Sequence, residues 1–512
     1  MPIPRSCRQG APSIPAVDIP TASAALQRSR PCAPWTTGGR SRAISPRASP
    51  CVASSRPPRP WKHNRAGVHD PGTPNREGRC VVQQFRTALL LGPLVAVTPL
   101  SIDLYLPAFA MIAQDLGASE AEVQRTLIAY LLALVGAPFF YGQLSDHIGR
   151  KLPLLIGFAI YAAASAACAT AQSIDALVVF RFLQGLGGAA AMVCVQASVR
   201  DRYSGYEAAR MLSTLMLVMG LAPILAPIAG AAIIVNAPWQ SLFWVLAGMG
   251  TASFLLVAFC FKETLAHGNR LTGGARNSAR TLLSVLSDRR FLSPTMAGSL
   301  AQAGFFVYLT TAPFVIMGHF GQSPEMFALI FAANAIGLVA GSQLNVALLP
   351  RFGELRIARA ALAVYAVAAA GLLVLAVFRV DSLWLFIPLL CSCVASMGFI
   401  SPNTRAMAID SQPHRAGSAA ALMMMSQMGL GVVAAAIVSV WATMPVLSMS
   451  AAMAACSLMA LAIAHRAFTF CTAQQGVNVR NRRSNVYLSQ ARRRHIDDLA
   501  VRLDGDAGEL GR

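Results

Sequence analysis

Long apolar stretches separated by short polar joints repeat along most of this 512-residue chain. Each stretch is about 20 residues long, the length that a helix needs to cross the hydrocarbon core of a bilayer. The stretches cover approximately residues 87–110, 124–144, 152–171, 175–198, 211–234, 239–261, 292–317, 326–349, 357–378, 383–405, 417–438 and 444–467. They form two sets of six around a longer polar joint. The pattern predicts an all-α integral membrane protein with twelve transmembrane helices in two six-helix, pseudo-symmetric halves.

Composition supports this assignment. Hydrophobic residues make up 55% of the chain and charged residues only 12%, whereas soluble domains carry roughly 25% charged residues. A net charge of +20 would suggest nucleic-acid binding in a soluble fold, but here the basic residues gather in the two ends of the chain and in particular joints. We therefore expect the protein to contact membrane lipids and not nucleic acid.

The chain divides by composition into five parts. The first is rich in proline and arginine and has no stretch long enough to span a membrane, so we interpret it as a disordered extension or a misassigned translation start. Two apolar halves flank a central loop, and a polar, basic tail ends the chain. The predicted parts are 1–80 (extension), 81–261 (first half), 262–290 (loop), 291–468 (second half) and 469–512 (tail).

Lysine and arginine are distributed unequally between alternate joints, and this predicts the orientation. Most of these residues lie in the joints that follow the even-numbered stretches, whereas the joints after the odd-numbered stretches contain only Arg125 and Arg379. Lysine and arginine are enriched in cytoplasmic loops. The central loop and both termini are therefore predicted to be cytoplasmic.

A charged decapeptide, Gly142-Gln-Leu-Ser-Asp146-His-Ile-Gly149-Arg150-Lys151, joins the second and third stretches. We expect Gly142 to let a neighbouring helix approach closely and Gly149 to relieve backbone strain in the turn. Asp146 can accept hydrogen bonds from free backbone N–H groups at a helix end. Arg150 and Lys151 would hold the turn on the cytoplasmic side. These residues predict a tight loop that takes part in conformational gating.

Two stretches contain ionisable residues at membrane depth. The first carries Asp103 within Ser-Ile-Asp-Leu-Tyr-Leu-Pro, with the helix-kinking Pro107 one turn later. In the fourth, the spacing of Arg181, Gln184 and Gly188 places them on one helix face. Charged side chains are costly inside a bilayer and usually have a functional role or a partner.

The fifth stretch carries a further Gly/Pro pattern, made by Gly220, Pro223, Pro227 and Gly230. Together with the decapeptide loop, the Arg181 motif and a Pro-His-Arg-Ala-Gly segment before the eleventh stretch, it resembles the major facilitator superfamily. Within that superfamily the set is similar to the Bcr/CflA branch of drug:proton antiporters, the bicyclomycin and chloramphenicol resistance exporters. The resemblance covers about residues 81–468.

The resemblance implies a monomer in the bacterial inner membrane, with protons as the coupling ion and no other cofactor. This chain departs from the family pattern at three positions. His147 stands where the family usually has arginine or lysine, and Ala222 and Ala226 precede the two prolines in place of glycine. We interpret these departures as tolerable variation that leaves the fold unchanged.

Asp103 is our candidate for the group that gains and loses a proton during transport. Arg181 stays charged at any relevant pH, so it cannot carry the proton. We expect it to bias Asp103 directly or through water, with Gln184 as a neutral hydrogen-bond partner. Structural roles remain alternatives: Asp103 as a packing carboxyl neutralised by a neighbour, and Arg181 as a tie between helices.

The family architecture implies a central cavity lined by the first, fourth, seventh and tenth stretches. Aromatic and polar side chains there would suit lipophilic drugs, since ligand pockets are mostly apolar with a few polar groups. For each aromatic residue, contact with lipid or with another helix is the alternative reading. The candidate cavity residues are Tyr105, Gln302, Phe305, Phe306 and Tyr308.

We therefore predict a proton-coupled efflux transporter that exports small lipophilic drugs by alternating access. The chain has no phosphate-binding loop, no H-E-x-x-H and no G-x-S-x-G motif, and we expect neither an enzyme nor a metal site. Two alternatives stay open. One is a transporter of the same fold that carries an endogenous metabolite, and the other is a membrane sensor that transports nothing.

Overall fold

The computed structural model describes residues 75–265, 284–412, 415–441 and 444–466, and these are built of helices and short connections without strands. The helices before the central loop are α1 (Asn75–Asp103), η1 (Leu106–Ala108), α2 (Phe109–Asp115), α3 (Glu120–Ile148), α4 (Lys151–Ala169), α5 (Ile174–Arg202), α6 (Gly205–Asn236) and α7 (Gln240–Cys260). Those after it are α9 (Arg289–Pro313), η3 (Phe314–His319), α10 (Pro324–Phe352), α11 (Glu354–Val377), α12 (Leu383–Asp410), α13 (Ala416–Val440) and an unlabelled last helix, Pro445–Arg466. The predicted tail, nearly all of the predicted extension and most of the predicted central loop lie outside the described residues.

Eleven of the described helical spans are long and apolar enough to cross a membrane, and the bent helix α3 makes a twelfth. The bend in α3 is 48° and separates Glu120–Gly136 from Phe140–Ile148. Each of the twelve predicted stretches falls on one of these spans. The prediction of an all-α membrane protein with two six-helix halves is therefore confirmed.

The first span breaks at the place where the sequence predicts a kink. Helix α1 ends at Asp103, and the short 3-10 helix η1 contains Pro107. Proline has no N–H, so Pro107 cannot donate to the carbonyl four residues earlier, which belongs to Asp103. The break places the Asp103 side chain at a helix end deep inside the protein, where it is 4% exposed.

One helix of each half has the same length and the same kinds of residue at its two ends. Helices α3 and α10 are both 29 residues long; serine side chains cap their first turns, Ser119 and Ser323. Both end at a glycine with a positive φ, 99° at Gly149 and 74° at Gly353. A left-handed residue of this kind ends a helix at little cost only if it is glycine. The two halves therefore share this helix as a structural repeat.

Close helix packing in the first half depends on the small residues of α5, which lies against α3, α4 and α1. At Gly187, a Cβ atom would lie 2.5 Å from the backbone nitrogen of Tyr161 in α4. At Gly185, it would lie 2.6 Å from the carbonyl oxygen of Tyr130 in α3. The Gly-rich segment after Arg181 is thus a packing surface, as its position inside an apolar stretch suggests.

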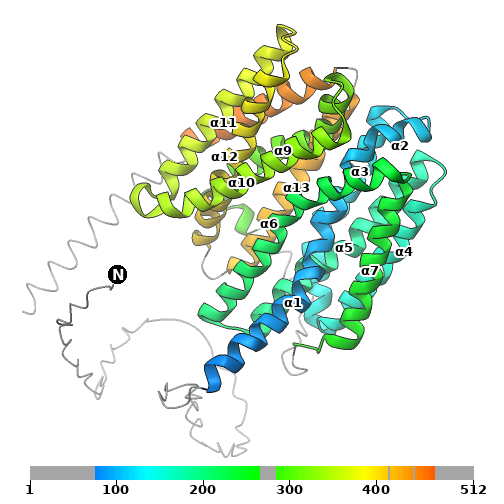
Figure 1. Ribbon diagram of the computed structural model, residues 1–512. Helices are drawn as coiled ribbons and strands as arrows, with labels where there is room; N and C mark the ends of the chain where they lie inside the picture. Colours follow the sequence, from blue (N-terminus) through cyan, green and yellow to red (C-terminus); the bar gives the residue numbers. More distant parts are fainter. Residues whose placement is uncertain (1–74, 266–283, 413–414, 442–443, 467–512) are drawn as a thin grey trace, which may run out of the picture. The chain divides into compact units, whose positions relative to one another are not determined.

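The halves meet through two helix pairs, α3 with α13 and α6 with α10 (Figure 1). A further contact lies at the end of the first span, where the rings of Phe109 and Phe314 are 5.5 Å apart. This contact is at the opposite end of the helices from the loop that joins α3 to α4. The interior between the pairs holds the candidate site.

Candidate functional site

A cavity of about 140 Å³ lies between the two halves and takes its walls from α1, α6, α9, α10 and α12. Nearly all of its surface is apolar, and it contains one carboxyl group, that of Asp103. The lining residues are Pro99, Ile102, Asp103, Pro223, Phe305, Phe306, Tyr308, Leu309, Phe331, Asn334, Ala335, Leu338 and Val394. The arrangement matches the general form of a small-molecule site, an apolar cavity with a few polar groups.

Asp103 is the acidic group of this cavity. No hydrogen bond or ion pair joins it to another residue in the part of the chain that the structure describes. Buried carboxyl groups normally have partners. A buried carboxyl that faces a cavity without a partner is suited to exchange a proton or to contact a ligand.

The predicted cavity residues divide into two groups. Phe305, Phe306 and Tyr308 on α9 line the cavity together with Asp103, as predicted from their helix. Tyr105 and Gln302 do not line it. The Tyr105 ring packs against Arg181 instead. Gln302 lies one turn before Phe305 and Phe306 on the same side of α9. A contact of these two residues with cargo stays a prediction.

Sequence reasoning missed the contribution of α10, the eighth span. Its residues Phe331 and Asn334 line the cavity, whereas the family architecture pointed to the first, fourth, seventh and tenth spans. One signal was available. Asn334 is the only strongly polar side chain in the apolar run Ile-Phe-Ala-Ala-Asn-Ala-Ile-Gly-Leu-Val, and a buried amide in such a run normally has a partner or a role.

Arg181 is fully buried and is held by neutral groups. Its Nη1 donates to Oε1 of Gln184 at 2.5 Å, and its Nη2 donates to the carbonyl oxygen of Ser101 at 3.1 Å. Its guanidinium also lies over the rings of Tyr105 and Tyr130, 4.2 and 4.4 Å from their centroids. Cation–π contacts of this kind are strongest where water is excluded. The predicted pairing of Arg181 with Gln184 on one face is confirmed.

The direct contact between Arg181 and Asp103 that we considered is absent from this structure, which has no ion pair between these two described residues. Ser101 and Asp103 are two positions apart on α1, so their side chains leave the helix in nearly opposite directions. Ser101 hydrogen bonds Tyr161 of α4 at 2.6 Å, and Gln184 donates to Ser165 of α4 at 2.7 Å. These bonds favour the reading of Arg181 as part of a tie between α1, α4 and α5.

Arg150 is the centre of the loop between α3 and α4. Its Nη1 bonds Oδ1 of Asp146 at 2.6 Å and Oγ of Ser145 at 2.7 Å, and its Nε bonds Oδ2 of Asp201 at 2.9 Å. The Arg150 side chain is only 8% exposed. A buried cation needs such pairing because removal of one partner leaves an uncompensated charge. The loop is therefore fastened to the end of α5, which carries Asp201.

The role that we predicted for Asp146 is filled by another acid. The backbone N–H groups of Arg150 and Lys151, at the start of α4, donate to the carboxylate of Glu263, at 2.9 and 3.1 Å. The Lys151 ammonium donates to the carbonyl of Ala258 near the end of α7, at 2.9 Å. Both contacts complement helix dipoles. The prediction for Asp146 is wrong because its carboxylate is drawn to the Arg150 guanidinium instead.

The two loop glycines differ in their roles. Gly149 adopts a positive φ of 99°, so its predicted relief of backbone strain is confirmed. Gly142 was expected to admit a neighbouring helix, but a Cβ atom there would meet no other atom within 4 Å. That expectation is wrong, because the space beside Gly142 is open.

Glu263 provides the first test of the loop. Partial burial acts to raise its pKa, but the backbone N–H groups of Arg150, Leu265, Lys151 and Thr264 together hold the pKa below its usual value. A lowered pKa in the folded state stabilises the fold above the unfolded pKa of about 4.3, and this contribution is lost as the pH falls through the folded pKa. We expect Glu263→Gln to destabilise the protein at pH 7 by up to about 1 kcal/mol.

This difference is expected to shrink as the pH falls through the lowered pKa of Glu263 in the folded protein, because the wild-type carboxylate is then protonated too. Thermal unfolding of both purified proteins at neutral and acidic pH measures it. An equal difference in melting temperature at the two pH values would show that the carboxylate charge does not stabilise the loop.

The Gly/Pro pattern of the fifth span lies on α6, beside the break in the first span. A Cβ atom at Gly230 would collide with the carbonyl oxygen of Leu104, and one at Gly220 would touch Val339 of α10. Pro223 lines the cavity and Pro227 is buried. The four residues thus form the side of α6 that faces α1 and α10.

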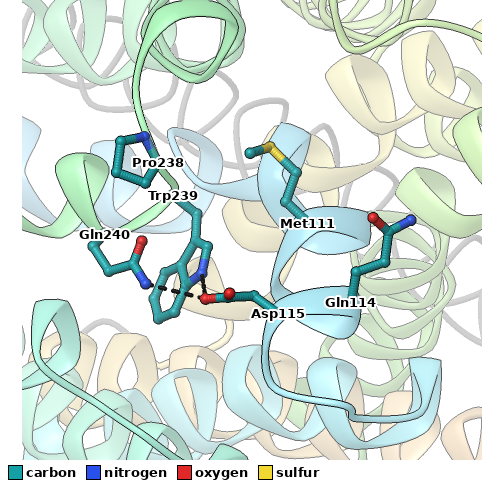
Figure 2. A pocket seen from close by; sticks show the side chains of 6 residues that line it. All are labelled: Met111, Gln114, Asp115, Pro238, Trp239 and Gln240. Carbon is teal, nitrogen blue, oxygen red and sulfur yellow. Dashed lines mark hydrogen bonds between the residues drawn. The ribbon is translucent and has the colours of Figure 1, made fainter.

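A second, more open cavity of about 410 Å³ lies where α2 meets the start of α7, and no sequence pattern predicted it. It is lined by Met111, Gln114, Asp115, Pro238, Trp239 and Gln240. As Figure 2 shows, the carboxylate of Asp115 accepts hydrogen bonds from the indole N–H of Trp239 at 2.7 Å and from the amide of Gln240 at 3.1 Å. These bonds fasten the end of the first span to α7.

Within the described residues, no group of histidine, cysteine, aspartate or glutamate side chains is arranged to hold a metal ion.

Two bundles of membrane-length helices around a cavity with a single acid define a polytopic membrane protein of the transporter class. Residues 91–436 match the family model of the Major Facilitator Superfamily. The chain belongs to this superfamily, as its motifs predicted, and it is a transporter and not an enzyme.

Individual relatives give the same result. The chain is 35% identical to the uncharacterized MFS-type transporter YdgK of Bacillus subtilis over 70% of this chain and 89% of the relative. It is 29% identical to the bicyclomycin resistance protein homolog of Haemophilus influenzae, over 69% of this chain and 89% of the relative. A shorter match, 47% of this chain and 61% of the relative at 35% identity, is to the multidrug resistance protein MdtL of Escherichia coli.

Solved structures resemble the fold at low sequence identity. A bacterial homolog of the human lysosomal transporter Spinster, in an inward-facing and unoccupied conformation, superposes with a TM-score of 0.58 at 15% identity, over 75% of this chain and 96% of that one. The nucleoside transporter NupG gives the same TM-score at 11% identity, over 75% and 99% of the two chains. At these identities the likeness concerns the fold alone.

Proposed function

We propose that this protein is a proton-coupled exporter of small lipophilic drugs, of the Bcr/CflA type. The observation that carries the proposal is the apolar cavity between the halves, in which Asp103 is the only carboxyl group. An apolar wall suits a lipophilic cargo, and a buried acid without a partner suits a proton. The names of two relatives, a bicyclomycin resistance protein homolog and a multidrug resistance protein, support a drug as the cargo.

The size of the cavity supports alternating access. At about 140 Å³ it is smaller than the roughly 300–1,000 Å³ typical of sites for drug-sized ligands, so the halves must move apart to load one. The contact of Phe109 with Phe314 closes the end of the helices opposite the Arg150 loop. We propose that this closed end is periplasmic and that cargo enters from the cytoplasmic side.

The arginine and lysine residues of the joints support an orientation with both termini in the cytoplasm. We propose the bacterial inner membrane as the location. We further propose that it works as a monomer among membrane lipids, with the proton as coupling ion and no resident cofactor. One proton that moves inward across ~100 mV supplies about 2.3 kcal/mol. That sustains a gradient of roughly 40-fold for a neutral drug.

Drug-driven proton release from proteoliposomes tests the proposal. We expect amphenicols, bicyclomycin or cationic dyes to cause proton release, read with a pH-sensitive dye, from vesicles that contain the protein and not from empty vesicles. Release with none of these compounds would contradict drug export and would favour a metabolite as the cargo, since a shared fold does not determine what is carried.

A further inference from the structure

Two polar side chains form a hydrogen-bonded pair in the wall of the cavity. Asn334 of α10 and Tyr308 of α9 are each 1% exposed, and the amide Nδ2 of Asn334 donates to the Tyr308 hydroxyl at 3.0 Å. The Tyr308 ring is stacked on Phe331, with centroids 5.9 Å apart and planes 17° apart. Aromatic packing of this kind fixes the ring, and so the hydroxyl is held in place.

The amide oxygen of Asn334 is buried and has no hydrogen-bond partner among the described residues. Several buried hydroxyl groups also lack a partner, including that of Thr311. A helix hydroxyl can turn to donate to the carbonyl of the preceding turn, but an amide oxygen can only accept. The Asn334 oxygen therefore needs a donor from outside its own helix, and Asn334 is one of the residues that line a cavity that could admit one.

The hydroxyl of Tyr308 completes the chemistry. It accepts from Asn334 and still has its own proton to donate. The pair thus offers one acceptor and one donor side by side in a wall that is otherwise apolar. A purely structural role, in which the pair links α9 to α10, would explain the hydrogen bond between Asn334 and Tyr308. It would not explain why the amide oxygen of Asn334 is left without a partner.

We propose that Asn334 and Tyr308 form a hydrogen-bonding subsite that recognises cargo with a hydroxyl or amide N–H group on a lipophilic body. A hydroxyl group would donate to Oδ1 of Asn334 and accept from the hydroxyl of Tyr308, whereas an amide would donate through its N–H and accept through its carbonyl oxygen. The inference rests on the proposed drug export. It adds that the cavity selects cargo by hydrogen bonding at α10, apart from any role of Asp103.

Two ligands separate hydrogen bonding from apolar contact. Chloramphenicol carries hydroxyl groups and an amide N–H, whereas tetraphenylphosphonium is a lipophilic ion without a hydrogen-bond donor. In Asn334→Leu the acceptor is replaced by an apolar side chain. Loss of one partner of a buried hydrogen bond weakens binding by about tenfold. We expect this loss for chloramphenicol and a change of less than about twofold for tetraphenylphosphonium, which makes no such bond.

The measurement is the binding of each radiolabelled ligand to purified full-length protein in nanodiscs. Tyr308→Phe is the second variant and should also weaken the binding of chloramphenicol but not that of tetraphenylphosphonium. It keeps the proposal testable if Asn334→Leu folds poorly. Leu338→Met, an apolar exchange in the same cavity wall, is the control and should affect both ligands alike.

Equal losses for both ligands, or no loss for either, would overturn the subsite. Failure of the proposed function looks different. The wild-type protein would then bind neither ligand and would release no protons with any drug, and the subsite would fall with it.

Discussion

Replacement of Asp103 by asparagine is expected to abolish drug-driven proton release and to lower the drug gradient from roughly 40-fold to about one. Asparagine has nearly the size of aspartate and keeps hydrogen-bonding capacity, but it cannot carry a proton. Asp103 is the only carboxyl group that lines the cavity between the halves. Drug could still move down its own gradient through the variant, because the apolar walls are unchanged.

Proteoliposomes with a pH-sensitive dye and a labelled drug measure both quantities together. Asp175→Asn is the matched control, since Asp175 is exposed in the first turn of α5 and does not line the cavity. It should leave proton release unchanged. Full proton release by Asp103→Asn would assign the proton to another group.

The same variant separates the functional from the structural reading of Asp103. A packing carboxyl held by a neighbour would leave that neighbour unpaired on substitution, at a cost of about 1–3 kcal/mol. No described residue is joined to Asp103 by a hydrogen bond or an ion pair. We therefore expect the melting temperature of Asp103→Asn to equal or exceed that of the wild-type protein, and a clear decrease would support the packing role.

The helices could be predicted from sequence because the bilayer imposes their length and polarity. Each apolar stretch is long enough to span a membrane, and the polar joints between the stretches are short. The number and the order of the transmembrane helices were therefore unambiguous. The break in the first span was also readable, since Pro107 removes the donor that the Asp103 carbonyl needs. We did not predict the bend in α3, although Pro138 lies in the sequence between the two parts of this helix and marks a bend for the same reason.

The site was harder to predict because it depends on how each helix is rotated about its axis. Asp103 and Arg181 were natural partners by charge, yet the packing of α1 turns Ser101 toward Arg181 and Asp103 toward the cavity. Glu263 accepts a hydrogen bond from the backbone N–H of Arg150, which is 113 residues away in the sequence. A local sequence pattern cannot predict a bond over such a distance. Asn334 was a visible polar residue, but only the contact of α6 with α10 shows which space it faces.

Gly187→Val is expected to prevent stable folding. A Cβ atom at this position would lie 2.5 Å from the nitrogen of Tyr161 and 2.6 Å from the carbonyl oxygen of Gly157, both backbone atoms of α4. Flexible side chains can move away from an added methyl group, but two helix backbones can only separate. Overpacking costs about 1–3 kcal/mol or more, against a total stability of about 5–15 kcal/mol.

Gly248→Val is the matched control, because a Cβ atom at Gly248 in α7 would meet no atom within 4 Å. Both substitutions place valine inside a helix, so both carry the same small change in helix propensity. The difference between them in yield of monodisperse protein, and in melting temperature where both can be purified, isolates the contact between α4 and α5. Helix α5 also holds Arg181 and Gln184. A similar yield for the two variants would mean that the tie between α1, α4 and α5 tolerates separation of the helices. The hydrogen bonds of this tie, and not its close packing, would then hold the first half together.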